Sequence, residues 1–89
     1  MATARDVARW MSEQIESKKE LYQEEAVWEI ENLFGSKFVY ENENGNPAIN
    51  RRVLQEFRKL TEQTVLWERG GRFWRFRQAH DDPERRQTE

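Results

Sequence analysis

Residues 64–77 read TVLWERGGRFWRFR, and this stretch predicts a β-hairpin near the end of the chain. Two runs rich in β-branched and aromatic residues flank a Gly-Gly pair at 70–71, which is typical of a two-residue hairpin loop of the primed type. In the register that such a loop imposes, Trp67 faces Trp74 on one side of the ribbon. That side is wholly apolar and the other is mixed, as expected for a sheet with one buried face.

A helix is predicted directly upstream of the hairpin, over residues 50–62. Asn50 is a favoured N-cap residue, and the apolar positions that follow recur at helical spacing. The predicted buried stripe comprises Val53, Leu54, Phe57 and Leu60. The predicted outward arc comprises Arg51, Arg52, Gln55, Arg58, Lys59 and Glu62.

Two further helices are predicted in the first half of the chain, at about residues 4–18 and 23–34. Thr3 and Asp6 approximate a capping box at the start of the first of them. Leu21 and Tyr22 lie between them as a short extended segment. The second helix is expected to bury an apolar stripe made of Ala26, Val27, Ile30, Leu33 and Phe34, with Gly35 as a left-handed residue at its end. Residues 41–47 form a turn region in which Pro47 is expected to end any strand pairing.

The order of these elements predicts an α+β fold that is winged-helix-like, with three helices and a C-terminal two-stranded β-hairpin. In such a fold the third helix is offered to the major groove of DNA and the hairpin forms a wing beside it. The connection over residues 35–49 is longer than usual, so an unrelated α+β arrangement is the alternative, with Phe38–Tyr40 as a short third strand against the ribbon. We expect one domain over residues 1–78 and a disordered charged tail over 79–89.

Charge is distributed unevenly along the 89 residues, although the net charge is only −2. Residues 1–49 carry five basic and ten acidic side chains, a net charge of −5. Residues 50–79 carry eight basic and three acidic side chains, a net charge of +5. An asymmetry of this size within a small domain indicates separate acidic and basic surfaces.

The basic region supplies the leading candidate site. Arginine matches phosphate groups and guanine edges with two parallel hydrogen bonds, and glutamine can pair with adenine. The candidate nucleic-acid-binding residues are Arg51, Arg52, Gln55, Arg58 and Lys59 on the third helix, and Arg69 and Arg72 at the tip of the wing. The sequence therefore predicts a domain that binds duplex DNA through residues 50–62 and 64–77. A charged helix face that is merely solvated is the alternative interpretation.

Trp28 lies about 160° away from the centre of the apolar stripe of the second helix. A large apolar residue in such a position marks either an interface or a second internal contact, here with Trp10 or with the loop after Tyr40. The alternative function is therefore a protein-interaction module that uses the acidic N-terminal half and Trp28, with a protein partner or a second copy of the chain.

Several classes of function are not expected. The chain has no cysteine, and its one histidine, His80, falls in the predicted tail, so no nucleophile with an activating base is apparent. Glu41 and Glu43 lack the full pattern of a cation-binding loop. We therefore expect no enzyme activity, no metal, no other cofactor and no small-molecule substrate. No apolar run approaches the length that spans a bilayer and no secretion signal is visible, so we expect a cytoplasmic protein without a membrane partner.

The chain resembles a family of small, uncharacterised bacterial proteins that share a domain of unknown function. The resemblance covers most of residues 3–77. The most specific stretches are LYQ at 21–23, FG at 34–35, FVYENENGN at 38–46, VLQEFRKLT at 53–61, WER at 67–69 and WR at 74–75. The resemblance implies a bacterial or phage-borne cytoplasmic protein, and it assigns no activity and no functional residue.

Overall fold

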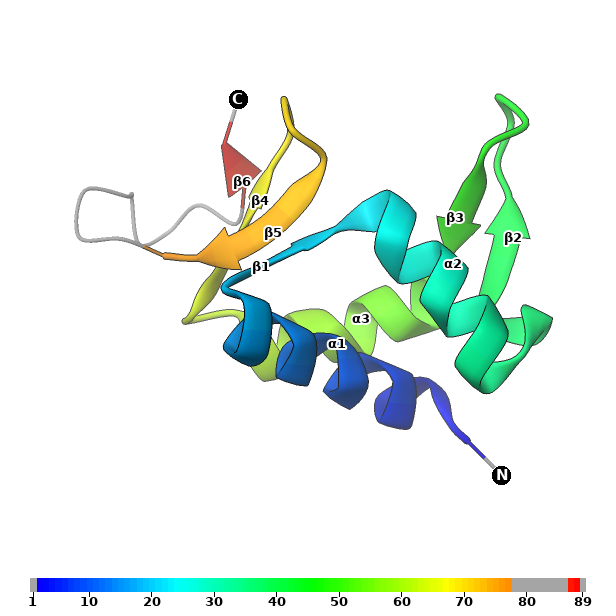
Figure 1. Ribbon diagram of the computed structural model, residues 1–89, viewed down its shortest axis with the longest axis horizontal. Coiled ribbons are helices and arrows are strands. Elements are labelled where there is room, and N and C mark those ends of the chain that lie inside the picture. The colour runs from blue at the N-terminus through cyan, green and yellow to red at the C-terminus, as the bar shows by residue number, and fades with distance from the viewer. Residues whose placement is uncertain (1, 78–86, 89) are drawn as a thin grey trace.

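The computed structural model describes residues 2–77 and 87–88. The helices are α1 (Ala4–Lys18), α2 (Gln23–Phe34) and α3 (Arg51–Thr61), and a 3-10 turn, η1 (Ser36–Phe38), follows α2. The strands are β1 (Glu20–Tyr22), β2 (Val39–Glu41), β3 (Pro47–Ile49), β4 (Val65–Glu68), β5 (Phe73–Phe76) and β6 (Gln87–Thr88). The fold is α+β as predicted, and Figure 1 shows two hairpins, β2–β3 and β4–β5, rising on the same side of the helices.

The larger sheet has an antiparallel core in the order β1-β5-β4. The predicted pairing of Trp67 with Trp74 is confirmed, and their ring centroids lie 4.7 Å apart. The extended segment between the first two helices forms β1, which places Leu21 opposite Trp74 on β5. This strand ties the N-terminal half of the chain to the C-terminal hairpin.

Most of the tail predicted over residues 79–89 lies outside the described residues. Its two described residues, Gln87–Thr88, form β6, which pairs with β4 in parallel.

The predicted third strand does not join this ribbon. Val39–Glu41 pairs with Pro47–Ile49 instead and makes a separate antiparallel hairpin. Pro47 was expected to end strand pairing, yet it begins β3, because the first residue of a strand can do without the N–H that proline lacks. Within the turn, the Asn42 side chain accepts hydrogen bonds from the backbone N–H groups of Asn44 and Asn46, at 2.9 and 3.0 Å.

Helix α1 begins with the predicted capping box. The Thr3 backbone N–H donates to Asp6 Oδ2 at 2.9 Å, and the Asp6 backbone N–H donates to the Thr3 hydroxyl oxygen at 3.2 Å. The two bonds satisfy donors that the first turn of a helix leaves without partners. Hydrogen bonding to Thr3 lowers the pKa of Asp6 below its ordinary value. The larger effect comes from the Thr3 backbone and the smaller from its side chain.

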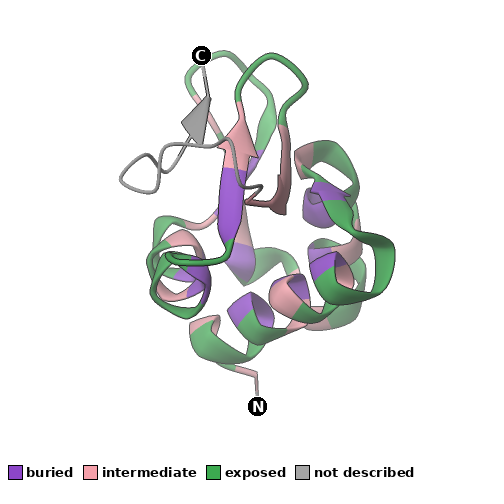
Figure 2. Cartoon of the chain, turned by 90° about the vertical axis from the view of Figure 1, so that its left-hand side faces the viewer, coloured by how far each residue is buried: buried purple, intermediate pink, exposed green. Residues whose placement is uncertain are grey.

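The core lies between the three helices and the inner side of the sheet, where Figure 2 shows the buried residues gathered. Helix α3 packs along α1, and Val53 and Phe57 of α3 are buried together with Met11 of α1. The Phe57 ring meets the edge of Trp74 at a centroid distance of 5.3 Å, which joins α3 to the sheet. Each large apolar side chain buried here contributes roughly 1.5–3 kcal/mol.

Two leucines predicted to be buried are exposed instead. Leu33 is 61% exposed and Leu60 is 41% exposed. Both lie at the edge of their apolar stripe and near the end of a helix, where none of the described elements covers them. The neighbouring Thr61 is buried, and its hydroxyl donates to the carbonyl of Phe57 at 2.7 Å. This hydrogen bond satisfies the hydroxyl, so a polar residue can occupy the buried position.

Candidate nucleic-acid interface

Helix α3 presents the predicted outward residues to solvent. Asn50 caps the helix, and its side chain accepts a hydrogen bond from the Arg52 backbone N–H at 2.8 Å. From this start, a turn of 100° per residue places all the predicted outward residues within an arc of about 120°. Each of these positions on α3 is exposed: Arg51, Arg52, Gln55, Arg58 and Lys59. The burial of Val53 and Phe57 on the opposite side fixes this orientation.

The hairpin tip carries the other two predicted residues, but its loop differs from the prediction. Strand β4 ends at Glu68 and β5 begins at Phe73, each one residue further from the tip than predicted, so the loop has four residues, 69–72. The Arg72 backbone N–H donates to the Glu68 carbonyl at 2.8 Å. The left-handed residue is Arg72, with φ of 56°, and neither glycine of the pair has positive φ. A longer loop accommodates one such residue at its end, whereas a two-residue primed turn needs positive φ at its centre.

Gly71 is required in this loop for space. A Cβ atom at Gly71 would collide with the Phe73 ring, whereas one at Gly70 would meet nothing within 4 Å. The Phe73 ring is held in place by Tyr22 of β1, at a centroid distance of 4.9 Å. The packing of this ring therefore shapes the tip on which Arg69 and Arg72 stand exposed.

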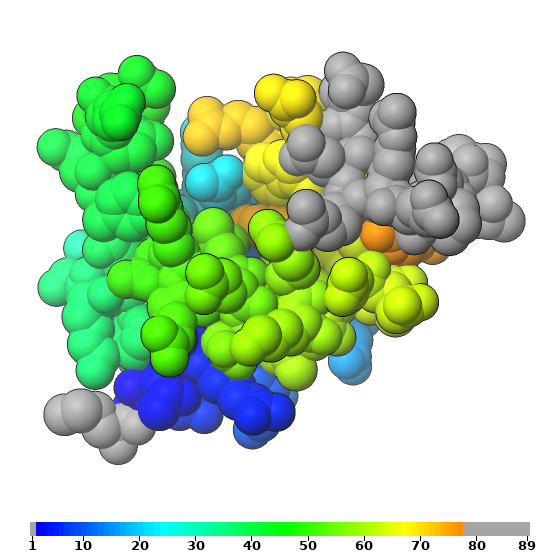
Figure 3. All heavy atoms as spheres, turned by 180° about the vertical axis from the view of Figure 1, so that it is seen from behind, coloured from blue at the N-terminus to red at the C-terminus, as the bar shows by residue number. Residues whose placement is uncertain are grey.

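We call the set Arg51, Arg52, Gln55, Arg58, Lys59, Arg69 and Arg72 the basic surface. Figure 3 shows α3 across the middle of one face of the molecule and the β4–β5 loop above it. Strand β4 follows α3 after a short turn, and its four residues span roughly 13 Å at 3.3 Å per residue. The loop cations therefore stand above α3, at the far end of β4.

Most of these cations are not neutralised within the described part of the chain. There, no carboxylate lies within 4 Å of Arg51, Arg52, Arg58, Arg69 or Arg72. Lys59 is the exception, because its Nζ lies 3.3 Å from Glu56 Oε2. This pair is exposed on the lysine side, and such pairs contribute little to stability, so Lys59 remains available to another anion.

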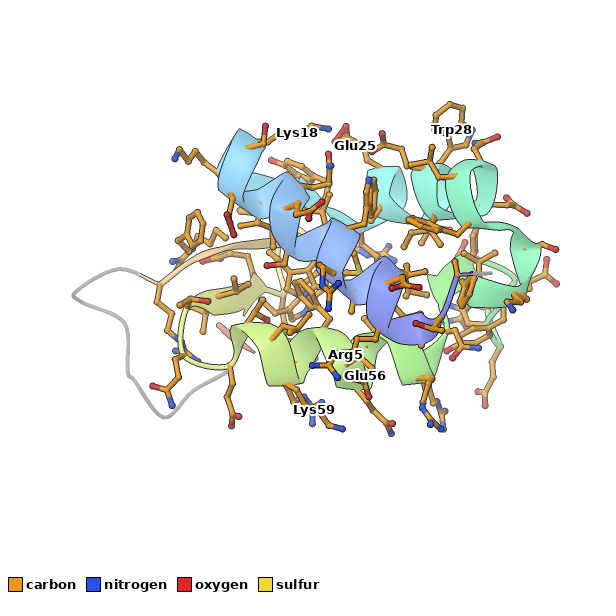
Figure 4. The ribbon with its side chains drawn as sticks, turned by 90° about the horizontal axis from the view of Figure 1, so that it is seen from below. Arg5, Lys18, Glu25, Trp28, Glu56 and Lys59 are labelled. Atoms are coloured by element: carbon orange, nitrogen blue, oxygen red, sulfur yellow. The ribbon has the colours of Figure 1, made fainter. Side chains whose placement is uncertain are left out.

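Two charged features lie near the basic surface, and the sequence did not predict the position of either. Arg5 of α1 points toward Glu56 and Lys59 of α3 (Figure 4), which adds a cation from the acidic half of the chain. It went unnoticed because only the packing of α1 on α3 brings it there, and no local pattern encodes that packing. The second feature is acidic. Glu41 and Glu43 are exposed on the β2–β3 hairpin, which stands at the other end of the same face (Figure 3).

Trp28 is 68% exposed, so the internal contact considered for it does not form. Trp10, one of its proposed partners, packs instead against Phe34 in an edge-to-face arrangement, with ring centroids 6.0 Å apart. Trp28 therefore stands on the surface of α2, far from the core stripe of its own helix.

Residues 2–77 and 87–88 contain no group of three or more histidine, cysteine or acidic side chains placed to hold a metal ion. No helix among them is both long and apolar enough to cross a membrane.

A family described as "Family of unknown function (DUF6953)" matches residues 3–76. The chain belongs to this family. DUF6953 membership covers all three helices and the sheet strands β1, β4 and β5, so it applies to the whole arrangement that carries the basic surface and Trp28. No curated protein and no solved structure matches the chain, and the family description assigns no activity.

Proposed function

We propose that this protein binds duplex nucleic acid, in the first place DNA, through its basic surface and without catalysing a reaction on it. The observation that carries the proposal is that most cations of this surface are not paired with carboxylates. Five arginines, on α3 and on the β4–β5 loop, are exposed and have no carboxylate partner in the described part of the chain. Cations left unpaired on one side of a domain attract a polyanion and release its condensed counterions on binding.

The residue types suit a groove as well as a phosphate backbone. An α-helix with its side chains is about 10–12 Å wide, which matches the major groove of B-DNA at about 12 Å. Arg51, Arg52 and Arg58 project from the exposed side of α3, where a guanidinium can take a phosphate or the edge of a guanine. Gln55 lies between them and has the amide that pairs with adenine.

We infer that the arrangement is a winged helix with an inserted hairpin. Two features support this inference: β1 lies between the first two helices and pairs with β5, and the β4–β5 hairpin follows α3 directly. The departure is the connection between α2 and α3, which holds η1 and the β2–β3 hairpin in place of a tight turn. Support for α3 comes mainly from α1, which packs along it and leaves its outward face open.

The acidic β2–β3 hairpin sets the direction in which a duplex would lie. Glu41 and Glu43 would repel phosphates at one end of the face, while Arg69 and Arg72 would attract them at the other. A duplex bound to α3 would therefore extend toward the β4–β5 loop and away from β2–β3.

A gel mobility assay with a short random-sequence DNA duplex tests the proposal. Arg51→Ala with Arg58→Ala removes two charges from the basic surface and should abolish the shifted band. The matched control is Lys18→Ala with Lys37→Ala, which removes the same charge from exposed positions elsewhere and should leave most of the binding intact. Circular dichroism confirms that both variants are folded. Unchanged binding by the Arg51/Arg58 variant would discard this face, and no binding by the wild type at low salt would discard the proposed function.

A further inference from the structure

Trp28 has no role in the proposed binding of nucleic acid. It projects from α2, and Figure 4 shows it on the opposite side of the helices from Glu56 and Lys59 of α3. At 68% exposure it presents most of an indole ring to water. Exposed tryptophan is costly in solution and is among the residues most enriched at binding hot spots, so its position needs an explanation outside the fold.

The neighbours of Trp28 form an open pocket with a negative lining. The pocket has a volume of about 390 Å³ and is lined by Lys18, Glu24, Glu25, Trp28 and Glu29. Lys18 Nζ lies 4.0 Å from Glu29 Oε2, so the lysine charge is offset by the nearest carboxylate. Glu24 and Glu25 are exposed and have no cation within 4 Å in the described part of the chain. Two carboxylates without a described cation partner therefore line the same pocket as an exposed indole.

We propose that this pocket, made by Trp28, Glu24 and Glu25, docks an arginine side chain from a basic segment of another protein. A guanidinium stacks on an indole face by cation–π attraction, for which tryptophan is the best aromatic partner. The same planar group donates parallel hydrogen bonds to carboxylates at its edge. The ring and the two carboxylates together therefore favour a guanidinium group, which neither feature would specify alone.

The openness of the pocket favours a protein segment over a small cation. Sites for small molecules bury most of the ligand surface, whereas an indole that is 68% exposed forms only one wall. A partner that brings its own surface can cover the rest of the ring and exclude water around it, which is how hot-spot residues gain their strength.

Charge complementarity alone would also allow α3 of a second copy to dock here. That contact would join unlike surfaces of two copies and would grow into a closed ring or an open chain of molecules. It would also cover the basic surface on each copy in turn. A different protein with an exposed basic segment leaves the basic surface free, and the two faces could then hold a duplex and a protein at the same time.

The probe for this site is a synthetic peptide that alternates arginine and serine, and its control is the same peptide with citrulline, which keeps the shape and removes the charge. Calorimetry measures affinity, and the indole N–H signal of Trp28 in a nitrogen-15 NMR spectrum, assigned with Trp28→Phe, reports on the site itself. We expect the arginine peptide to shift this signal and the citrulline peptide to leave it unchanged. Trp28→Leu, which keeps an apolar group but no aromatic face, should weaken binding about tenfold, and Trp28→Phe should weaken it less.

Matched variants separate this site from general attraction to an acidic protein. Glu24→Gln with Glu25→Gln should weaken binding more than Glu41→Gln with Glu43→Gln, which removes the same charge from β2–β3. Leu33→Ala removes an apolar residue that is 61% exposed on the same helix and should have no effect. Equal affinity for both peptides, or unchanged binding by Trp28→Leu, would overturn the proposal. So would a wild-type oligomer in sedimentation that becomes a monomer in Trp28→Ala, because a second copy would then be the occupant.

Discussion

The salt dependence of DNA binding offers a quantitative test of the basic surface. Each protein cation that meets a phosphate of B-DNA contributes about −0.9 to the slope of log K against log salt concentration. Five arginines of the surface have no described carboxylate partner, namely Arg51, Arg52, Arg58, Arg69 and Arg72. If all five meet phosphates, the slope is about −4.5, and affinity falls roughly 500-fold between about 50 and about 200 mM salt. Lys59 adds to this slope when it leaves Glu56 for the duplex.

The variant carrying Arg51→Ala and Arg58→Ala should lose two of these contacts. Its slope falls to about −2.7, and its affinity changes only about 40-fold over the same salt range. Fluorescence anisotropy with a labelled duplex at four or more salt concentrations measures both slopes. Equal slopes for the wild type and the variant would refute the reasoning, because the two arginines would then not contact phosphate. A wild-type slope near zero would refute it more broadly.

Two further predictions concern the fold. Gly71→Ala should lower stability by about 1–3 kcal/mol because the new methyl group displaces the Phe73 ring. Gly70→Ala should be neutral or raise stability by up to about 1 kcal/mol, because it lowers the conformational entropy of the unfolded chain. Thermal unfolding compares the pair, and equal melting temperatures would contradict this account of the loop. The carboxylate of Asp6 has a lowered pKa in the folded state, so its stabilising contribution is present above the pKa of the unfolded chain and is lost as the pH falls through the lowered value. Urea unfolding should accordingly show wild type more stable than Asp6→Asn at neutral pH, with the difference vanishing in acid, and a difference that persists unchanged at low pH would contradict it.

Local patterns in the sequence were sufficient to predict the helices and the pairing of the β4–β5 hairpin. The capping box at Thr3, the N-cap at Asn50 and the alternation around Trp67 and Trp74 each depend on residues close in the chain, and all three are present as predicted. Exposure of the basic side of α3 followed from the same reasoning, because burying Val53 and Phe57 leaves only one side for the charged residues.

Features that depend on contacts between distant elements were not predictable in this way. The pairing of Val39–Glu41 depends on whether β3 or the ribbon lies nearer in space, and local propensity cannot distinguish the two. Leu60 and Leu33 have apolar side chains at the right spacing, yet their burial depends on a neighbour that the described part of the chain does not supply. The shape of the β4–β5 loop follows from the Phe73 ring, which in turn is placed by Tyr22 of β1, a strand from the first half of the chain.

The most direct test of the central claim is an NMR titration of the arginine Nε–H signals with a short DNA duplex. The account predicts that the signals of Arg51, Arg52, Arg58, Arg69 and Arg72 shift together with one dissociation constant, while the indole signal of Trp28 stays in place. Shifts confined to α3 or to the loop alone, or no shift in any of the five, would show that these cations do not act as a single phosphate-binding surface.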